Sequence, residues 1–293
     1  MKPRIVFFGT PDFVLPILSS LTKHFSVVGV VTSPDAISGR KKLSAASPVK
    51  QFTQEKLSAT PILTPEKLDQ KAQEDLTRLT PDLFIVAAYG KIIPQEILLI
   101  PPHGSLNIHP SLLPKYRGTS PIQTMLLQGD TKSGVTIIQV DAQMDHGPIV
   151  AQWEIPITKT ATFASLHVSI FQDAADRLPE IINNYLAGKS KPIPQDESRA
   201  TYCERITRES GYVDAHNPPT PEKLDRMTRA YYPWPTAWTL LRLNALEGQA
   251  KEKRVRFLPG KKIQVEGGKA VAVKDFLNGY PKMKDFIEKL LET

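Results

Sequence analysis

The sequence predicts an α/β fold with a mostly parallel sheet, followed by a smaller domain rich in β-strands. Two observations support this. Short apolar runs alternate with helical patterns as far as Leu186, which is typical of a parallel sheet with helices on both faces. The segment 187–199 then carries two prolines, several charges and almost no large apolar residue, and short strand-like runs separated by Gly and Pro follow it.

Length and composition exclude several classes of protein. The chain has 293 residues, of which 41% are hydrophobic and 23% charged, so it can bury the cores of two domains. Its single cysteine, Cys203, excludes an internal disulfide framework and a Cys-rich zinc site. The apolar run Ile5–Phe8 is too short for a signal peptide, and no run approaches the roughly 20 residues of a membrane span. We therefore expect a cytoplasmic protein.

The elements of the first domain follow from the spacing of apolar residues. Short β-branched or continuously apolar runs predict buried strands, and apolar residues three or four apart predict helices that pack one face. The predicted strands are Arg4–Phe8, Val27–Val31, Leu83–Ala88, Ser105–Ile108, Val135–Val140 and Ile149–Ile157. The predicted helices are Pro11–Leu21, Val49–Leu57, Glu66–Leu79, Ser120–Gln128 and Thr162–Leu186, the last with a kink or break at Pro179.

The second domain is predicted to begin with a helix and to continue in short strands. The helix is Pro221–Ala230, with proline at its start. The strands are Ala237–Leu243, Arg254–Leu258, Lys262–Val265 and Ala270–Val273, a pattern that suits a small β-barrel or sandwich. Residues 208–293 carry a net charge of +5 out of +7 for the whole chain. This excess would attract a polyanion such as nucleic acid, but charge alone is equally consistent with a solubilising surface.

The densest polar cluster lies in Ser105–Pro114. Asn107 and His109 are two residues apart, so on an extended strand their side chains point to the same face. They stand at the end of a predicted strand, where open α/β sheets bind ligands. A histidine can relay a proton near neutral pH, and an asparagine amide can donate to an oxyanion. These residues alone leave open whether the pair is catalytic or only hydrogen-bonds a turn.

A second polar cluster, Asp141–Gly147, follows the predicted strand Val135–Val140. Asp145 could orient His109 or raise its basicity if the two loops meet. In isolation, a turn built on Asp and Gly is the favoured interpretation.

Two other loops carry weaker signals. Gly9–Asp12 has one glycine rather than the three of a dinucleotide-binding loop, so it indicates a tight strand-to-helix turn. Ser33–Ser47 is a long polar loop with three adjacent cations, Arg40, Lys41 and Lys42. These cations could grip a phosphate backbone, or they could be ordinary solvated charge.

The segment SLNIHPSLLPKYRG resembles the signature of the 10-formyltetrahydrofolate-dependent formyltransferases, and GVTIIQVDAQMDHGPI around Asp145 matches as well. The resemblance implies that Asn107, His109 and Asp145 are catalytic, with Asn107 and protonated His109 stabilising an oxyanion and Asp145 holding His109 and helping to move protons. The folate contacts that it implies are Ser111, Leu112, Leu113, Pro114, Tyr89, Gly90, Lys91, Ile92 and Asp141. No metal is expected, because the formyl donor is already activated.

Within that family, nearly the whole chain is similar to the members that formylate methionyl-initiator tRNA. The similar segments are IVFFGTPDF, PDAISGRKKLSAASPVK, VAAYGKIIP and GYVDAHNPPTPEKLDRMTRAYYPWPTAW, and DFLNGY at Asp275–Tyr280 resembles part of the last strands. The resemblance implies a Rossmann-like formyltransferase domain over 1–187, a linker over 188–207 and a C-terminal OB-like tRNA-binding β-barrel over 208–293.

The implied reaction transfers a formyl group from 10-formyltetrahydrofolate, a co-substrate, to the α-amine of methionyl-initiator tRNA for translation initiation. The implied partners are folate and the tRNA, which Arg40, Lys41 and Lys42 would contact, with no membrane partner and a monomeric chain. A sugar-nucleotide formyltransferase or a formyl-folate hydrolase domain would share Asn107, His109 and Asp145 but would need neither the basic loop nor the basic second domain. A non-catalytic RNA-binding protein would not need the three catalytic residues.

Overall fold

The computed structural model describes residues 1–38, 43–243 and 252–291. The strands in the first two thirds of the chain are β1 (Arg4–Gly9), β2 (Ser26–Val31), β3 (Ala36–Ser38), β4 (Leu43–Ala45), β5 (Ile62–Leu63), β6 (Leu83–Ala87), β7 (Ser105–His109), β8 (Lys132–Gln139) and β9 (Ile149–Pro156). The helices are α1 (Leu15–His24), α2 (Pro48–Lys56), α3 (Gln70–Arg78), α4 (Gln95–Leu98), α5 (Pro121–Gln128) and α6 (Phe163–Leu186).

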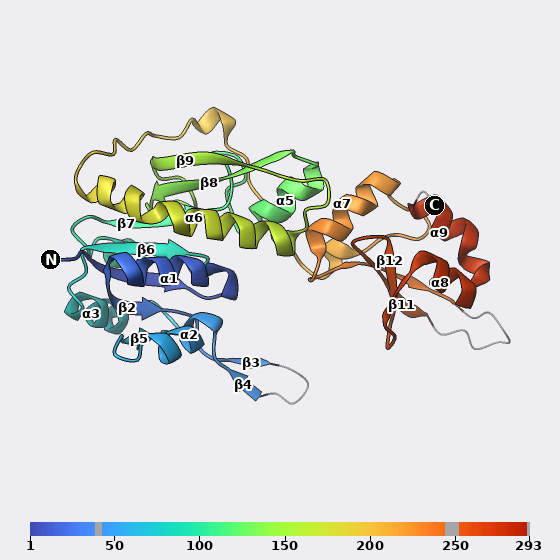
Figure 1. Cartoon of the computed structure of the whole chain (residues 1–293), viewed down its shortest axis with the longest axis horizontal. Helices are drawn as coiled ribbons and strands as arrows, with labels where there is room; N and C mark the ends of the chain where they lie inside the picture. Colours follow the sequence, from blue (N-terminus) through green and yellow to red (C-terminus); the bar gives the residue numbers. More distant parts are fainter. Residues whose placement is uncertain (39–42, 244–251, 292–293) are drawn as a thin grey trace. The chain divides into compact units, whose positions relative to one another are not determined.

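Seven of these strands form one sheet in the order β5-β2-β1-β6-β7-β8-β9 (Figure 1). The strands from β5 to β7 run parallel, and β8 runs antiparallel to β7. The mostly parallel α/β sheet that the sequence predicts is therefore confirmed.

The strand order reverses next to β1. The chain moves from β1 outward to β2 and β5, then returns to the other side of β1 with β6 and continues to β7. Such a reversal leaves an opening at the carboxyl ends of the two central strands, where doubly wound sheets bind ligands. In this chain the reversal lies next to Gly9 of β1 and Ala87 of β6, which pair with each other at the ends of their strands.

The core is built on both faces of the central strands. Val6 and Phe8 of β1 lie in one cluster with Phe84 of β6, Leu76 of α3 and Ile97 of α4. Their neighbours along the strands point to the opposite face and are also fully buried. Burial on both faces explains why β6 reads as an uninterrupted apolar run.

Helices α1 and α6 lie side by side (Figure 1). The Ser20 hydroxyl donates to the carbonyl of Ala175 at 2.7 Å, and the rings of Phe13 and Phe171 are 5.1 Å apart. Helix α6 runs unbroken from Phe163 to Leu186 and contains Pro179, so the break that proline permits does not occur.

By packing, the chain divides into two units. The first comprises residues 1–119, 133–155 and 167–202, and the second comprises 120–132, 156–166 and 203–293. The second unit contains α5 and the later elements α7 (Pro221–Tyr231), β10 (Ala237–Leu241), β11 (Lys253–Leu258), β12 (Lys262–Val265), β13 (Ala270–Ala272), α8 (Val273–Gly279) and α9 (Lys284–Leu291). Among its described residues, β10 to β13 form an antiparallel sheet in sequence order.

One segment of the second unit differs from the sequence-based expectation. Asp275–Tyr280, which resembles part of the last strands of the family, lies in and just after helix α8. Phe276 is buried and stacks on Tyr280, so the segment packs as one turn of an amphipathic helix.

Among the helices of the described residues, none combines the length and the hydrophobicity that a transmembrane span requires.

Candidate active site

Strand β7 carries Asn107 and His109, with the half-buried Asn107 opposite Ile138 and the buried His109 opposite Thr136 of β8. Because the two residues are two apart on an extended strand, their side chains share a face. The sequence-based prediction of a common face therefore matches the geometry of the strand. Pro110 follows directly and begins the loop after the strand.

The Asp145 carboxylate lies between these two side chains although it comes from the distant loop after β8. Its Oδ1 accepts from Asn107 Nδ2 at 3.3 Å and lies 3.6 Å from His109 Nδ1. Its Oδ2 accepts from the backbone N–H of Gly118 at 2.8 Å. An amide, an imidazole and a carboxylate thus meet at one point, and the Asp145 side chain is only 14% exposed.

The contacts of the His109 ring indicate which ring nitrogen carries a hydrogen. Nε2 lies 3.0 Å from the carbonyl oxygen of Tyr116, which can only accept, so Nε2 carries a proton. Nδ1 faces the Asp145 carboxylate, which in its ionised form also only accepts. At 3.6 Å this second contact is longer than a hydrogen bond, so it places the carboxylate beside the ring without a donation from Nδ1.

Unusual backbone conformations support this arrangement. Asp145 and Tyr116 both adopt the left-handed region, with φ of 52° and 65°. Such residues are strained relative to ordinary backbone and cluster at functional sites. Gly147 meets a different requirement, because a Cβ there would lie 1.8 Å from the carbonyl oxygen of Gln139 in β8. Only glycine lets the loop turn this close to the strand.

The predicted folate segment Ser111–Pro114 is anchored to β8. Thr136 Oγ1 donates to the carbonyl of Ser111 at 2.6 Å and accepts from the N–H of Leu113 at 3.1 Å. Gln152 Nε2 donates to the carbonyl of Leu113 at 2.8 Å, and the Leu113–Pro114 peptide is cis. The loop is therefore held through its backbone, and Leu112 and Pro114 remain partly exposed.

The predicted folate segment Tyr89–Ile92 follows β6 at the point where the strand order reverses. The Thr10 hydroxyl, which follows β1, donates to the carbonyl of Tyr89 at 3.1 Å. Lys91 Nζ donates to the carbonyls of Pro65 and Glu66 at 2.7 and 2.8 Å. Gly90 has a φ of 83°, and Ile92 is 92% exposed. The segment thus presents backbone and one apolar side chain to solvent.

The tyrosine of this segment is buried away from polar partners. The Tyr89 ring packs edge-on against Phe8, and its side chain is 2% exposed. Burial raises the pKa of Tyr89 to about 12, because the phenolate would be poorly solvated there.

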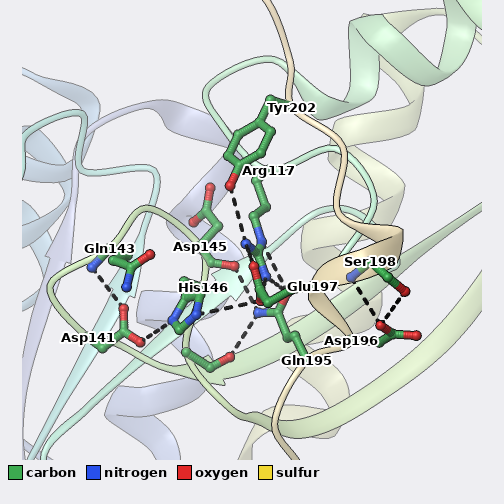
Figure 2. Close-up of polar contacts among 11 residues, drawn as sticks. Arg117, Asp141, Gln143, Asp145, His146, Gln195, Asp196, Glu197, Ser198 and Tyr202 are labelled. Atoms are coloured by element: carbon green, nitrogen blue, oxygen red, sulfur yellow. Dashed lines mark hydrogen bonds and ion pairs between the residues drawn. The ribbon is translucent and has the colours of Figure 1, made fainter.

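Asp141 lies in the same loop as Asp145. Its Oδ2 is 2.7 Å from His146 Nδ1, and its Oδ1 accepts from the N–H of Gln143 (Figure 2). This predicted folate residue therefore caps its own loop. The predicted tRNA contacts Arg40, Lys41 and Lys42 lie outside the described residues.

The sequence profile of the family described as formyl transferase matches residues 3–182. The chain belongs to this family. A methionyl-tRNA formyltransferase of Roseiflexus castenholzii is 43% identical over 284 residues, which cover 94% of this chain and 90% of that protein. A methionyl-tRNA formyltransferase of Bacillus velezensis is 39% identical over 268 residues, which cover 90% and 83%. The resemblance seen in the sequence is thereby confirmed.

Several solved structures share the fold. A 4-N formyltransferase from Francisella tularensis aligns with a TM-score of 0.66 at 17% identity, over 89% of this chain and 98% of that one. Methionyl-tRNA formyltransferase from Clostridium thermocellum aligns with a TM-score of 0.56 at 20% identity, over 92% of this chain and 96% of that one. HypX from Aquifex aeolicus in complex with tetrahydrofolic acid aligns with 0.61 at 19% identity, over 96% and 48%. At these identities the likeness shows a common Rossmann-like fold.

In this member of the formyl transferase family, one polar cluster escaped the sequence analysis (Figure 2). The Arg117 guanidinium is 1% exposed and binds Glu197 at 2.6 and 2.8 Å and Gln195 at 2.8 and 3.2 Å. The hydrogen bond to Glu197 raises the pKa of Arg117, and the same bond lowers the pKa of Glu197. The sequence signal for this cluster was the position of Arg117 near the end of the segment SLNIHPSLLPKYRG, three residues after Pro114.

The segment around Gln195 is more than the exposed connection that its composition predicts. The N–H of Arg117 donates to the carbonyl of Thr201 at 2.8 Å, and Ile149 and Ile193 exchange backbone hydrogen bonds. Proline and charged residues gave no hint of these contacts, because each depends on a partner far away in the sequence.

Proposed function

We propose that this protein transfers the formyl group of 10-formyltetrahydrofolate to the α-amine of methionyl-initiator tRNA. The observation that carries the proposal is the 43% identity to a methionyl-tRNA formyltransferase over 94% of the chain. The meeting of Asn107, His109 and Asp145 supplies a site with the chemistry that acyl transfer needs. The product would serve translation initiation, and the setting proposed is the cytoplasm.

The nucleophile in this proposal is the free α-amine of the methionyl group, which has a pKa near 7.7–8.0 and is partly neutral at pH 7. Asn107 stabilises the oxyanion that forms at the formyl carbon. Its Nδ2 uses one hydrogen on Asp145, and the second hydrogen on the same nitrogen supplies the donor. His109, charged and held between Tyr116 and Asp145, adds positive charge beside the same point.

Asp145 manages protons in this scheme. The amine must lose a proton and N10 of the folate must gain one. The Asp145 carboxylate, which the Gly118 N–H fixes beside the charged His109, would accept the proton of the amine and pass it on to N10. Because three groups hold it, the carboxylate is preorganised and need not reorient during the reaction.

The folate would lie in the opening at the reversal of strand order. The backbone of Tyr89–Ile92 and the loop Asp141–Asp145 would pair with the amide-like edge of the pterin. Exposed apolar side chains in the same loops, Ile92 and Met144, suit contact with a flat ring. Leu112 and Pro114, held by the backbone anchor on Thr136, would contact it from the second side.

The tRNA would contact the basic second unit, for which we propose an OB-like architecture and a tRNA-binding role over residues 208–293. One face of its sheet is buried and carries Val255, Phe257 and Ile263. The other face carries Trp238, and the guanidinium carbon of Arg254 lies 4.6 Å from the centre of its ring. Aromatic rings with adjacent arginines are typical platforms for nucleic acid.

Two further parts complete the proposal. Residues 1–187 would form the catalytic domain and 188–207 would connect it to the second domain, with the part up to Tyr202 packed on the first unit. The loop with Arg40, Lys41 and Lys42 would contact the acceptor end of the tRNA. The chain would act as a monomer.

The deciding experiment is a formyl-transfer assay with labelled 10-formyltetrahydrofolate and purified full-length protein. Methionyl-initiator tRNA, methionyl-elongator tRNA and a 4-amino sugar nucleotide are offered separately. We expect label only on the initiator tRNA. Label on the sugar nucleotide alone would overturn the proposal in favour of a sugar formyltransferase.

A further inference from the structure

The side chain of Gln195 joins two regions of the first unit that are far apart in the sequence (Figure 2). Its Nε2 donates to the carbonyl of Asp145 and to the carbonyl of Gly147, each at 2.8 Å. Its Oε1 accepts from Arg117 Nη2 at 2.8 Å and from Nε at 3.2 Å. A single amide thus bridges the buried arginine and the loop that carries the carboxylate.

These four contacts leave the amide of Gln195 only one orientation. Its two hydrogens are used by the two carbonyls, and its oxygen is used by the guanidinium. Turning the amide over would place its NH2 against the cation and its oxygen against the two carbonyls. The amide oxygen therefore always faces Arg117, and the amide nitrogen always faces the two carbonyls.

Arg117 is itself buried and bound on several sides. Its side chain is 1% exposed, and Glu197 binds it with two oxygens at 2.6 and 2.8 Å. Its backbone pairs with Tyr202, and the next residue, Gly118, donates its N–H to Asp145 Oδ2 at 2.8 Å. Asp145 is accordingly held at two points, through its carboxylate by Gly118 and through its carbonyl by Gln195.

Asp145 needs such restraint because its backbone is left-handed, with φ of 52°. Without a partner for its carbonyl, the loop could relax toward ordinary backbone and carry the carboxylate away from Asn107 and His109. The contacts described for Gln195 reach the loop only through the backbone carbonyls of Asp145 and Gly147. The influence of Arg117 and Glu197, which bind Gln195 or each other, therefore passes to the catalytic side chains through the loop backbone.

We propose that Gln195, oriented by Arg117 and Glu197, is a positioning residue that sets the Asp145 carboxylate between Asn107 and His109. The inference rests on the proposed roles of those three residues. Residues 195–202 pack with the first unit. Under this proposal they also contribute to its catalytic function.

The test is the variant Gln195→Glu in the full-length protein. A carboxylate has the same shape and still accepts from Arg117, so the clamp on the guanidinium is retained. The atom that faces the carbonyls of Asp145 and Gly147 becomes an acceptor, so both donations are lost and repulsion replaces them. We expect kcat for formyl transfer to fall about 10- to 100-fold, the cost of a displacement near 1 Å. The KM for methionyl-initiator tRNA should change little, and the Tm should fall moderately because the carbonyls of Asp145 and Gly147 lose their donor.

Ser198→Ala is the matched control from the same segment, because the Ser198 hydroxyl binds only the exposed Asp196 in Figure 2. It should retain the wild-type kcat. If Gln195→Glu fails to fold, Gln195→Asn replaces it, since the shorter amide cannot reach both Arg117 and the loop. The same loss of kcat is then expected.

Asp145→Asn, measured in parallel, separates this inference from the proposed function. A kcat within about twofold of wild type for the Gln195 variant, beside an inactive Asp145→Asn, would overturn the positioning role and leave the proposed function standing. Full activity of Asp145→Asn would overturn both.

Discussion

Asp145 Oδ1 lies 3.6 Å from His109 Nδ1, and Nε2 of the same ring donates to the carbonyl of Tyr116 at 3.0 Å. His109 ends strand β7 and Asp145 lies in the loop after β8, and both acceptors that meet the ring belong to left-handed residues. The position of the imidazole therefore depends on two strained turns. The site's chemistry rests on the charge of the carboxylate at the centre of this arrangement.

Replacing Asp145 by Asn should lower kcat by 10² or more, the usual range for losing a group that moves a proton. The amide keeps the size of the carboxylate and tolerates a left-handed backbone, so folding should be preserved. In one orientation of the new amide, its NH2 group would face the Asn107 amide and His109. In the other orientation, its NH2 group would face the Gly118 N–H, which would then have no acceptor. Single-turnover rates with methionyl-initiator tRNA check this, and a Tm near that of wild type shows that the fold is intact.

Replacing Asn107 by Ala should lower kcat about 10²- to 10³-fold, the cost of one oxyanion donor. The change removes the second N–H of Nδ2 and also one of the hydrogen bonds that fix Asp145. If Asn107 acts mainly on the transition state, the KM for 10-formyltetrahydrofolate should stay within a few-fold of wild type. A large rise in that KM with kcat unchanged would instead assign Asn107 to substrate binding.

Much of the fold was predictable because its signals are local. The apolar run at Leu83–Ala87 and the spacing of Asn107 and His109 both arise from the two-residue period of a strand. The convergence of Asp145 on His109 came from the family resemblance, since periodicity says nothing about which loops meet. Helix α8 was missed because the expectation for Asp275–Tyr280 came from the family resemblance, and so short a segment shows no helical period that could have corrected it.

The role of Gln195 lay beyond sequence reasoning for a physical reason. Its environment is set by Arg117, 78 residues earlier, and by the carbonyls of Asp145 and Gly147. Backbone carbonyls have no signature in a sequence, and a glutamine among prolines and charges looks like solvent-exposed chain. Only the folded arrangement shows that all its hydrogen-bonding capacity is used.

Replacing Tyr89 by Phe should raise the free energy of unfolding by about 1 kcal/mol. Within the described part of the chain, the buried Tyr89 hydroxyl has no hydrogen-bond partner, so Phe removes a desolvated polar atom without changing the packing. Tyr185→Phe is the contrasting control, because its hydroxyl donates to the carbonyl of His103 at 2.9 Å and accepts from Gln139. Urea unfolding at pH 7 should show opposite signs for the two variants.

The same tyrosine predicts an alkaline limit to stability. Its pKa is raised to about 12 in the folded protein, whereas an unfolded tyrosine loses its proton near pH 10. Between these values the unfolded chain binds fewer protons, so the free energy of unfolding falls as pH rises from about 10 to 12. Tyr89→Phe should make this fall shallower by up to about 1.4 kcal/mol per pH unit. An unchanged slope would contradict the assignment.

Reversing the charges of Lys41 and Lys42 with Glu should raise the KM for methionyl-initiator tRNA and leave the affinity for 10-formyltetrahydrofolate unchanged. The reason is electrostatic, because two cations that would meet phosphate become two anions that repel it. The double variant Lys67→Glu/Lys71→Glu makes the same change of charge on exposed residues near α3. Equal activity of the Lys41/Lys42 variant at limiting tRNA would refute the role of the loop.

Replacing Arg256 by Gln should weaken tRNA binding several-fold through the loss of one positive charge on the exposed sheet face. Arg256 lies opposite Trp238 on β10 and opposite Gln264 on β12, so it shares that face with the ring beneath Arg254. If it contacts a phosphate, the slope of log affinity against log salt concentration should decrease by about 1. Arg78→Gln on α3 is the control, because it removes the same charge from an exposed arginine already paired with Asp75. Binding titrations between low and physiological salt check this, and a slope equal to that of the control would place the tRNA on another face.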